Sequence, residues 1–310
     1  MQEFSYALEE NLLAIAQELR GGKYLPDAYV SFYVRDPKLR HIHKASVRDR
    51  LVHQALFRVL YPLFDLTFIY DSYSCRVGKG THRGVRRLEA FARKASANHT
   101  RIVYALQCDI RKFFDCIDHG ILTELLRHRV ADPDTQGLIA DILSSFESSP
   151  GKGLPLGNVT SQLFANVYLN EFDHWAKHSL KARFYIRYCD DFVILHESSE
   201  HLRGIIPSIQ KALANLLRLE LHPRKTSIRK LRQGIDFLGY VVRPHATTLR
   251  TKTKRRMLRK LNARNAPSYL GMLSHADAHK IRAAVLERLR NAPPNADGSY
   301  AMREAEEEYP

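Results

Sequence analysis

Hydrophobic residues recur every three or four positions over most of this chain, which is the spacing of one face of an α-helix. The first such stretch covers residues 4–19, where leucine and isoleucine fall on one face and Gly21-Gly22 follows as a stop signal. The same pattern predicts helices over residues 46–60, 80–93, 121–130, 135–146, 160–179, 201–219, 253–262 and 278–289. The chain is therefore expected to be rich in helices.

Three other segments are built from β-branched and aromatic residues and predict strands. They are residues 102–106, a hairpin over 185–195, and residues 236–242. Helices that alternate with a few antiparallel strands are typical of an α+β architecture. We therefore expect an α+β fold.

The predicted hairpin carries Asp190 and Asp191 at its turn, between two apolar runs. Paired aspartates in a tight turn are common and can be turn chemistry alone. Here, however, the flanks are too apolar for a solvated loop, so a buried sheet would present two adjacent carboxylates. Like charges at such close range stay ionised only when a cation neutralises them. The pattern therefore favours a divalent metal site.

Asp109 ends the predicted strand 102–106 and supplies a third carboxylate if that strand pairs with the hairpin. A strand-terminal aspartate is otherwise more often a cap or turn residue. Carboxylates on rigid strands suit Mg²⁺, which keeps waters and takes substrate phosphates as its other ligands. Two such ions would hold the attacking and leaving oxygens of an in-line phosphoryl transfer.

The 310 residues contain 48 Lys and Arg against 33 Asp and Glu, a formal net charge of +15. Such a charge favours binding to a polyanion, with an affinity that depends on salt. Nine basic residues and no acidic residue lie from Arg243 to Arg264. We expect residues 253–262 to form a basic helix along a nucleic-acid backbone, with Met257, Leu258 and Leu261 facing inward.

The four cysteines, Cys75, Cys108, Cys116 and Cys189, show no paired metal-ligand spacing, which argues against zinc and disulfides. No apolar leader and no run of transmembrane length is seen. These features predict a cytoplasmic protein with no membrane partner.

Several ordered sequence blocks from about Lys44 to Tyr240 resemble those of reverse transcriptases. The blocks are Ser72 to Gly80, Cys108-Asp109-Ile110-Arg111-Lys112-Phe113-Phe114-Asp115, Gly153 to Gln162, Tyr188-Cys189-Asp190-Asp191, Lys225-Thr226 and Asp236-Phe237-Leu238-Gly239-Tyr240. This resemblance implies the right-hand polymerase fold. It places an N-terminal helix and fingers in residues 1–100, the palm in 101–242, a short thumb in 243–290 and a mobile acidic tail in 291–310.

The resemblance also implies roles for individual residues. Asp109, Asp190, Asp191 and the carbonyl of Ile110 would hold two Mg²⁺ ions, which Mn²⁺ could replace, and Lys225 would protonate the pyrophosphate leaving group. The incoming dNTP would meet Arg76 and Lys79 at its triphosphate, Phe113 or Phe114 at its sugar, and Leu156, Gly157 and Gln162 at its base. Phe237, Leu238 and Gly239 would grip the primer.

Leu156 and Gln162 depart from the family pattern, in which a glutamine and a proline are usual at these places. This form resembles the reverse transcriptases of diversity-generating retroelements, which copy a template RNA with errors opposite adenine. An aliphatic side chain in place of an amide removes hydrogen bonds that could hold the base, and lost preorganisation loosens discrimination. The resemblance implies template RNA, a DNA primer and dNTPs as partners, together with a basic helical accessory protein, in a bacterial or phage-encoded system. A retron-type or phage-defence enzyme and a catalytically idle RNA-binding scaffold remain as alternatives.

Overall fold

The computed structural model describes residues 4, 6–35 and 39–290. The chain divides into two compact units, each assembled from three separate segments. The first unit contains residues 1–80, 107–193 and 204–226, and the second contains residues 81–106, 194–203 and 227–310. The acidic tail predicted for residues 291–310 lies outside the described residues.

The first unit begins with helix α2 (Leu8–Arg20), a hairpin of strands β1 (Val30–Arg35) and β2 (Leu39–Lys44), and helix α3 (Val47–Asp65). The two strands pair antiparallel, with Val30 opposite Lys44. Helix α3 starts where it does because the Ser46 side chain accepts a hydrogen bond of 3.0 Å from the Asp49 amide, which satisfies one of the free amides of the first turn.

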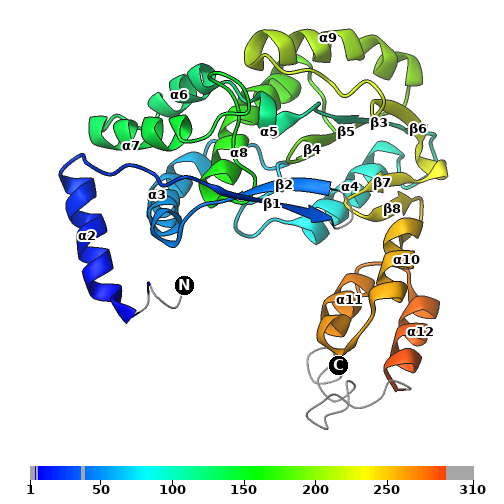
Figure 1. Cartoon of the computed structure of the whole chain (residues 1–310). Coiled ribbons are helices and arrows are strands. Elements are labelled where there is room, and N and C mark those ends of the chain that lie inside the picture. The colour runs from blue at the N-terminus through cyan, green and yellow to red at the C-terminus, as the bar shows by residue number, and fades with distance from the viewer. Residues whose placement is uncertain (1–3, 5, 36–38, 291–310) are drawn as a thin grey trace. The chain divides into compact units, whose positions relative to one another are not determined.

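A four-stranded sheet has the order β4-β5-β3-β6. Strands β3 (Tyr104–Asp109), β4 (Tyr185–Tyr188) and β5 (Asp191–His196) lie side by side in Figure 1, and β6 spans Ser227–Lys230. The predicted hairpin is confirmed as β4 and β5, joined by Cys189 and Asp190. Asp191 is the first residue of β5 rather than part of the turn.

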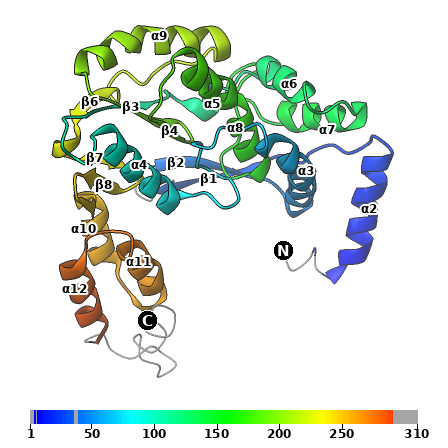
Figure 2. The same cartoon turned by 180° about the vertical axis from the view of Figure 1, so that it is seen from behind.

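The remaining helices of the first unit surround its core. They are α5 (Phe113–Cys116), α6 (His119–Arg127), α7 (Pro133–Ser144), α8 (Val159–His174), a π-helical turn (Trp175–Ser179) and α9 (Ser199–Leu217), which begins in the second unit. Helix α6 packs beside α8, and α7 packs beside α6 at the outer edge in both views (Figures 1 and 2). Tyr168 and Phe172 of α8 are fully buried, as are Tyr185 and Ile186 of β4, so α8 and the hairpin form the centre of the core.

The second unit contains helix α4 (Thr81–Ala95), a three-stranded antiparallel sheet and a set of short C-terminal helices. The sheet has the order β7-β8-β9, with β7 at Ile235–Phe237, β8 at Tyr240–Arg243 and β9 at Ala246–Leu249. The helices are α10 (Thr251–Lys260), α11 (Ala266–Leu273) and α12 (His279–Arg290), with 3-10 turns at Leu231–Gln233 and Ala263–Asn265.

Residues 236–242 do not form the single strand that their composition predicted. They form β7 and β8, joined by a tight turn at Leu238 and Gly239, which both adopt positive φ, at 54° and 90°. The helix predicted over 253–262 is confirmed as α10, two residues earlier, and Met257 is fully buried. Leu258 and Leu261 are only half-buried. No helix in the described ranges is both long and apolar enough to cross a bilayer.

Candidate active site

Asp109 and Asp190 are brought together by the pairing of β3 with the β4–β5 hairpin. The backbone amide of Ile110, directly after Asp109, donates a 3.2 Å hydrogen bond to the carbonyl of Asp190. On the other side of β3, the amide of His222 donates to the carbonyl of Asp109 at 2.8 Å. Asp109 is thus fixed from both sides, and its residue is 8% exposed.

The Asp109 carboxylate has one satisfied oxygen and one unsatisfied oxygen. Lys225 Nζ lies 2.5 Å from Oδ2. Oδ1 is buried and has no hydrogen-bond partner among the described residues. A buried carboxylate oxygen without a partner is costly, so such a position needs an explanation such as an ion that binds there.

Burial and neighbouring charges raise the pKa values of Asp190 and Asp191. Burial, and then the neighbouring Asp109 charge, raises the pKa of Asp190 above its usual range. Burial, followed by the charges of Asp190 and Asp109, raises the pKa of Asp191 to about 7, although the residue keeps a solvent-exposed part. The site therefore carries more negative charge than the single ammonium of Lys225 balances.

These residues fit a divalent cation by donor type and by the free oxygen of Asp109. In the described part of the chain, however, no three His, Cys, Asp or Glu side chains already surround a common metal position. The cation that contacts the Asp109 carboxylate is the Lys225 ammonium, on Oδ2. Lys225 has 43% of its side chain exposed.

Phe113 and Phe114 follow the Asp109 strand and form the start of the short helix α5. Phe113 is buried at 2% exposure, while Phe114 is half-buried. The Phe114 carbonyl accepts a 2.8 Å hydrogen bond from the Leu154 amide. Of the two aromatic rings, Phe114 is therefore the more accessible.

Leu156 and Gly157 lie beside strand β2. The amide of His43 donates a 3.1 Å hydrogen bond to the carbonyl of Leu156. Gly157 has φ +117°, which favours glycine, and a Cβ placed there would make a tight contact of 3.3 Å with Ile42 Cγ2. Gln162 is exposed on the first turns of α8, which follow Asn158.

Arg76 and Lys79 are already engaged inside the first unit. Arg76 Nε donates to Asp65 Oδ1 at 2.7 Å and Nη1 donates to the carbonyl of Ile69 at 2.7 Å, with 7% of the side chain exposed. Lys79 Nζ donates to the carbonyl of Tyr70 at 2.8 Å and lies 3.5 Å from the Tyr70 ring centroid. The Arg76 contacts hold the loop that follows α3.

The two units differ sharply in charge. The described residues of the first unit have 23 Lys and Arg against 20 Asp and Glu, a net charge of +3. The described residues of the second unit have 23 against 6, a net charge of +17. Phe237, Leu238 and Gly239 belong to this basic unit, at the turn between β7 and β8.

A cavity of about 580 Å³ opens on the basic unit. Its lining includes Arg86 and Arg93 of α4 and Arg243 at the end of β8, with Glu89 and Asp277 on the same wall. Both acids accept hydrogen bonds from Thr247. Its hydroxyl donates to Glu89, and its backbone amide donates to Asp277 at 2.8 Å. Neither Arg86 nor Arg93 forms an ion pair with any residue that the structure describes.

Two fully buried charged residues of the first unit were not predicted from the sequence. Arg187 and Asp173 are both fully buried and form an ion pair with a 2.6 Å contact. Arg187 stands in the strand before Asp190, and a charged residue in an otherwise apolar strand was the signal that could have found it. Asp173 gave no such signal, because an aspartate near the end of a long helix is ordinarily exposed.

Comparison with known proteins agrees with this arrangement. Residues 35–242 match the family model described as "Reverse transcriptase (RNA-dependent DNA polymerase)". Protein YkfC of Escherichia coli is 26% identical over 273 residues, which cover 75% of this chain and 71% of that protein. The group II intron-encoded protein LtrA of Lactococcus lactis is 24% identical over 307 residues, and this chain spans about half of its length.

Solved structures share the fold at low sequence identity. A telomerase from Candida albicans, solved with a TWJ fragment of telomeric RNA, superposes with a TM-score of 0.59 and 13% identity, over 86% of this chain and 54% of that chain. The apo telomerase of Candida tropicalis gives 0.55 and 12%, over 85% and 56%. The fold is therefore the right-hand polymerase fold, and with two thirds of its length matched by the family model, this chain belongs to the reverse transcriptase family.

Proposed function

We propose that this protein is an RNA-directed DNA polymerase that extends a DNA primer along an RNA template. The observation that carries this proposal is the buried Asp109 oxygen without a partner, beside the crowded carboxylates of Asp190 and Asp191. Asp109, Asp190, Asp191 and the Ile110 carbonyl would hold two Mg²⁺ ions, or Mn²⁺ in their place. When bound, these ions would activate the primer 3′-hydroxyl and neutralise the charge of the departing pyrophosphate.

The chain's own residues would position the dNTP. Phe114, the more accessible of the aromatic pair, would contact the sugar, with buried Phe113 supporting it. Leu156, Gly157 and Gln162 would face the base pair, because the positive φ of Gly157 gives the backbone a path that other residues rarely adopt.

We assign the triphosphate contact to Lys79, with Arg76 ordering the loop on which Lys79 stands. Arg76 is buried and bonded to Asp65, which favours a supporting role over a direct phosphate contact. Lys225 would lose its contact with Asp109 when a cation binds and would then serve as the general acid for pyrophosphate.

The basic unit would bind the template–primer. Its charge of +17 suits the phosphate backbone, to which Arg86, Arg93 and helix α10 would contribute. Phe237, Leu238 and Gly239 would grip the primer strand. In the terms of the polymerase fold, we assign residues 1–100 to the N-terminal helix and fingers, 101–242 to the palm and 243–290 to the thumb.

We propose further that the enzyme is error-prone at template adenines and serves a diversity-generating retroelement, together with a basic helical accessory protein in a bacterial cytoplasm. Leu156 supports this, because an aliphatic side chain cannot hold a base through the hydrogen bonds of an amide. The second candidate is an intron-type enzyme. The observation that supports it is the similarity to LtrA, an intron-encoded protein.

The test is extension of a DNA primer on a defined RNA template with Mg²⁺ and dNTPs, followed by sequencing of the cDNA. Errors concentrated at template adenines would support both the activity and the retroelement assignment. Faithful cDNA would support the intron-type enzyme. Product formation by the Asp190→Ala/Asp191→Ala variant would contradict the assignment of these aspartates to the active site. No product from the wild-type protein even with its RNA and accessory partners would contradict the polymerase assignment and favour an RNA-binding scaffold.

A further inference from the structure

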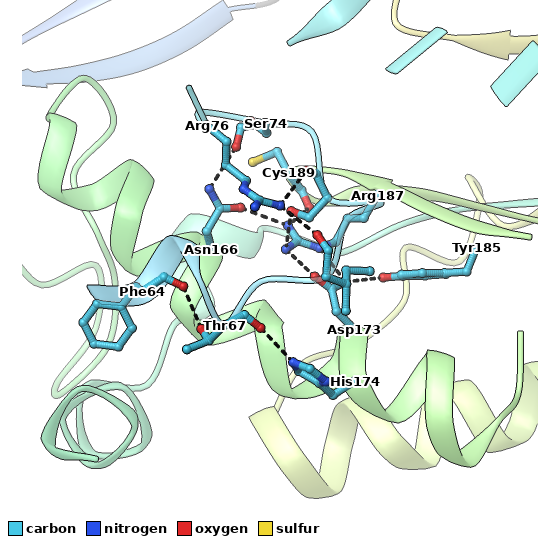
Figure 3. A network of polar contacts seen from close by, with 12 residues as sticks. Phe64, Thr67, Ser74, Arg76, Asn166, Asp173, His174, Tyr185, Arg187 and Cys189 are labelled. Atoms are coloured by element: carbon cyan, nitrogen blue, oxygen red, sulfur yellow. Dashed lines mark hydrogen bonds and ion pairs between the residues drawn. The ribbon is translucent and has the colours of Figure 1, made fainter. Parts of the chain in front are cut away.

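A fully buried arginine lies directly before the Asp190 turn (Figure 3). All five N–H donors of Arg187 have an acceptor. Nε and Nη2 bond both oxygens of Asp173, at 2.7 and 2.6 Å. The other donors reach Ser72 Oγ at 3.1 Å, Asn166 Oδ1 at 3.3 Å and the carbonyl of Cys189 at 3.0 Å.

These acceptors come from three separate parts of the first unit. Asp173 and Asn166 belong to α8, Ser72 to the loop after α3, and Cys189 to the turn of the β4–β5 hairpin. The loop also follows the edge of β4, because the Arg187 amide donates to the Asp71 carbonyl at 3.0 Å. In Figure 3 the Asp173, Asn166 and Cys189 contacts converge on one guanidinium.

Stability alone does not explain this arrangement. A buried ion pair contributes little net stability compared with well-packed apolar residues, because desolvation of the two charges offsets their attraction. Removing one partner alone is nevertheless strongly destabilising, because the other charge stays buried. The pair differs from an apolar contact in its geometry. A planar guanidinium holds each hydrogen-bond acceptor at a defined angle.

The group that Arg187 directs is a strained turn. Cys189 has φ 54°, a left-handed conformation that is uncommon for a residue with a side chain. Such a conformation persists only where its surroundings impose it. The Arg187 bond to the Cys189 carbonyl is one such constraint, and the bond from the Ile110 amide to the Asp190 carbonyl, at 3.2 Å, is another.

We propose that Arg187 and Asp173 form a buried clamp that positions the Cys189–Asp190 turn, and with it the Asp190 carboxylate, for nucleotidyl transfer. This inference rests on the polymerase function proposed above. Arg187 touches no reacting atom and is a positioning residue. Asp173 is held in turn by the hydroxyl of Tyr185, which donates to its Oδ1 at 2.6 Å.

Two variants test the clamp. Arg187→Met/Asp173→Asn removes both charges together, and the new amide oxygen can still accept from Tyr185, so that no charge is left buried alone. Arg187→Lys keeps the pair with Asp173, but one ammonium cannot also reach the Cys189 carbonyl, Asn166 and Ser72. The control is Lys177→Met/Asp71→Asn, which removes a neighbouring ion pair of 2.8 Å that joins the loop after α3 to the π-helical turn Trp175–Ser179.

Hydrogen exchange of the free protein is the first measurement. Both clamp variants are expected to exchange several-fold faster in peptides covering residues 107–112 and 188–192, and to keep wild-type protection over most of α8. Single-turnover dNTP incorporation is the second measurement. We expect a rate about 100-fold lower, a several-fold higher Mg²⁺ requirement and an unchanged template–primer Kd, whereas the control keeps the wild-type rate.

Wild-type exchange at the turn together with a wild-type incorporation rate in both variants would overturn the clamp. A lower rate with unchanged exchange would also overturn it, because the turn would then not depend on Arg187. If the wild-type protein makes no cDNA, the proposed polymerase function fails, but the exchange measurement still decides whether Arg187 holds the turn.

Discussion

The Lys225 ammonium lies 2.5 Å from Oδ2 of Asp109, while Oδ1 of the same carboxylate is buried without a partner. A mobile cation thus occupies one side of a carboxylate whose other side is unsatisfied. Because 43% of the Lys225 side chain is exposed, we expect it to move away at low cost if a metal ion binds to Asp109. Under the proposed function, Lys225 would then be an exchangeable counter-charge.

Lys225→Met is therefore expected to slow dNTP incorporation by about 10²-fold, through loss of the general acid, while leaving the fold intact. Lys225 is partly exposed, but its loss leaves the buried Asp109 carboxylate without its counter-charge, so it should cost about 1–3 kcal/mol of unfolding free energy. Pre-steady-state incorporation and thermal melting measure the two effects. The matched control is Lys211→Met on the exposed side of α9, and an equal loss of rate in that variant would contradict the assignment.

Asp191→Asn is expected to stabilise the metal-free protein at pH 7.5. The folded-state pKa of Asp191 is raised to about 7, so folding favours its protonated form. Its contribution to stability is present below the unfolded pKa, near 4, and is lost as pH rises through the folded value. In EDTA, the wild-type Tm should therefore fall between pH 5 and pH 7.5 relative to that of the variant, by a few degrees.

Mg²⁺ should reverse the order of the two Tm values, so that the wild-type protein becomes more stable than Asp191→Asn. Added Mg²⁺ is expected to raise the Tm of the wild-type protein, because a ligand that binds only the folded state stabilises it, and to raise that of Asp191→Asn much less. Equal Mg²⁺ stabilisation of the two proteins would place the metal elsewhere.

Leu156→Gln is expected to lower misincorporation opposite template adenine by several-fold, since an amide can again hydrogen-bond the nascent pair. Leu156→Met is the control, because it preserves volume and apolar character. Sequencing of cDNA made on one RNA template gives both error spectra. The same error frequency at template adenines in wild type, Leu156→Gln and Leu156→Met would show that Leu156 does not determine fidelity.

Arg86→Gln/Arg93→Gln is expected to weaken binding of single-stranded RNA and to reduce the slope of log K against log salt by about 1.4, or about 0.7 for each lost phosphate contact. The matched control is Arg203→Gln/Glu200→Gln, which neutralises an exposed ion pair of α9 with no change in net charge. Fluorescence anisotropy across a salt series measures both slopes. An unchanged slope would show that the cavity on α4 meets no phosphate.

The sequence predicted the parts of the fold where local pattern and tertiary structure agree. The hairpin around Asp190 and the helices α3, α8 and α9 follow from periodicity and from caps such as Ser46. The sequence could not show that 236–242 folds back at Leu238, because an apolar run with one glycine is also a good strand. The β1–β2 hairpin was missed because both of its strands are largely exposed and lack alternation.

The site was predictable to the level of residue type and spacing. Asp109, Asp190 and Asp191 could be grouped by strand pairing, and the adjacency of Ile110 and Asp190 agrees with that grouping. The contact of Lys225 with Asp109 spans 116 residues, and that of Arg187 with Ser72 spans 115. Such contacts depend on the complete tertiary arrangement, which no local pattern in a single sequence encodes.

The Arg187 guanidinium also has a consequence for the order of folding. Its acceptors are drawn from Ser72, Asn166, Asp173 and Cys189, so none of the local segments can complete this network by itself. Contacts between distant parts of a chain form late, because the entropy of closing a long loop is lost before the contacts can stabilise the chain. A nascent or partly folded chain would then lack an ordered Asp190 turn, and nucleotide chemistry would begin only once the first unit has assembled.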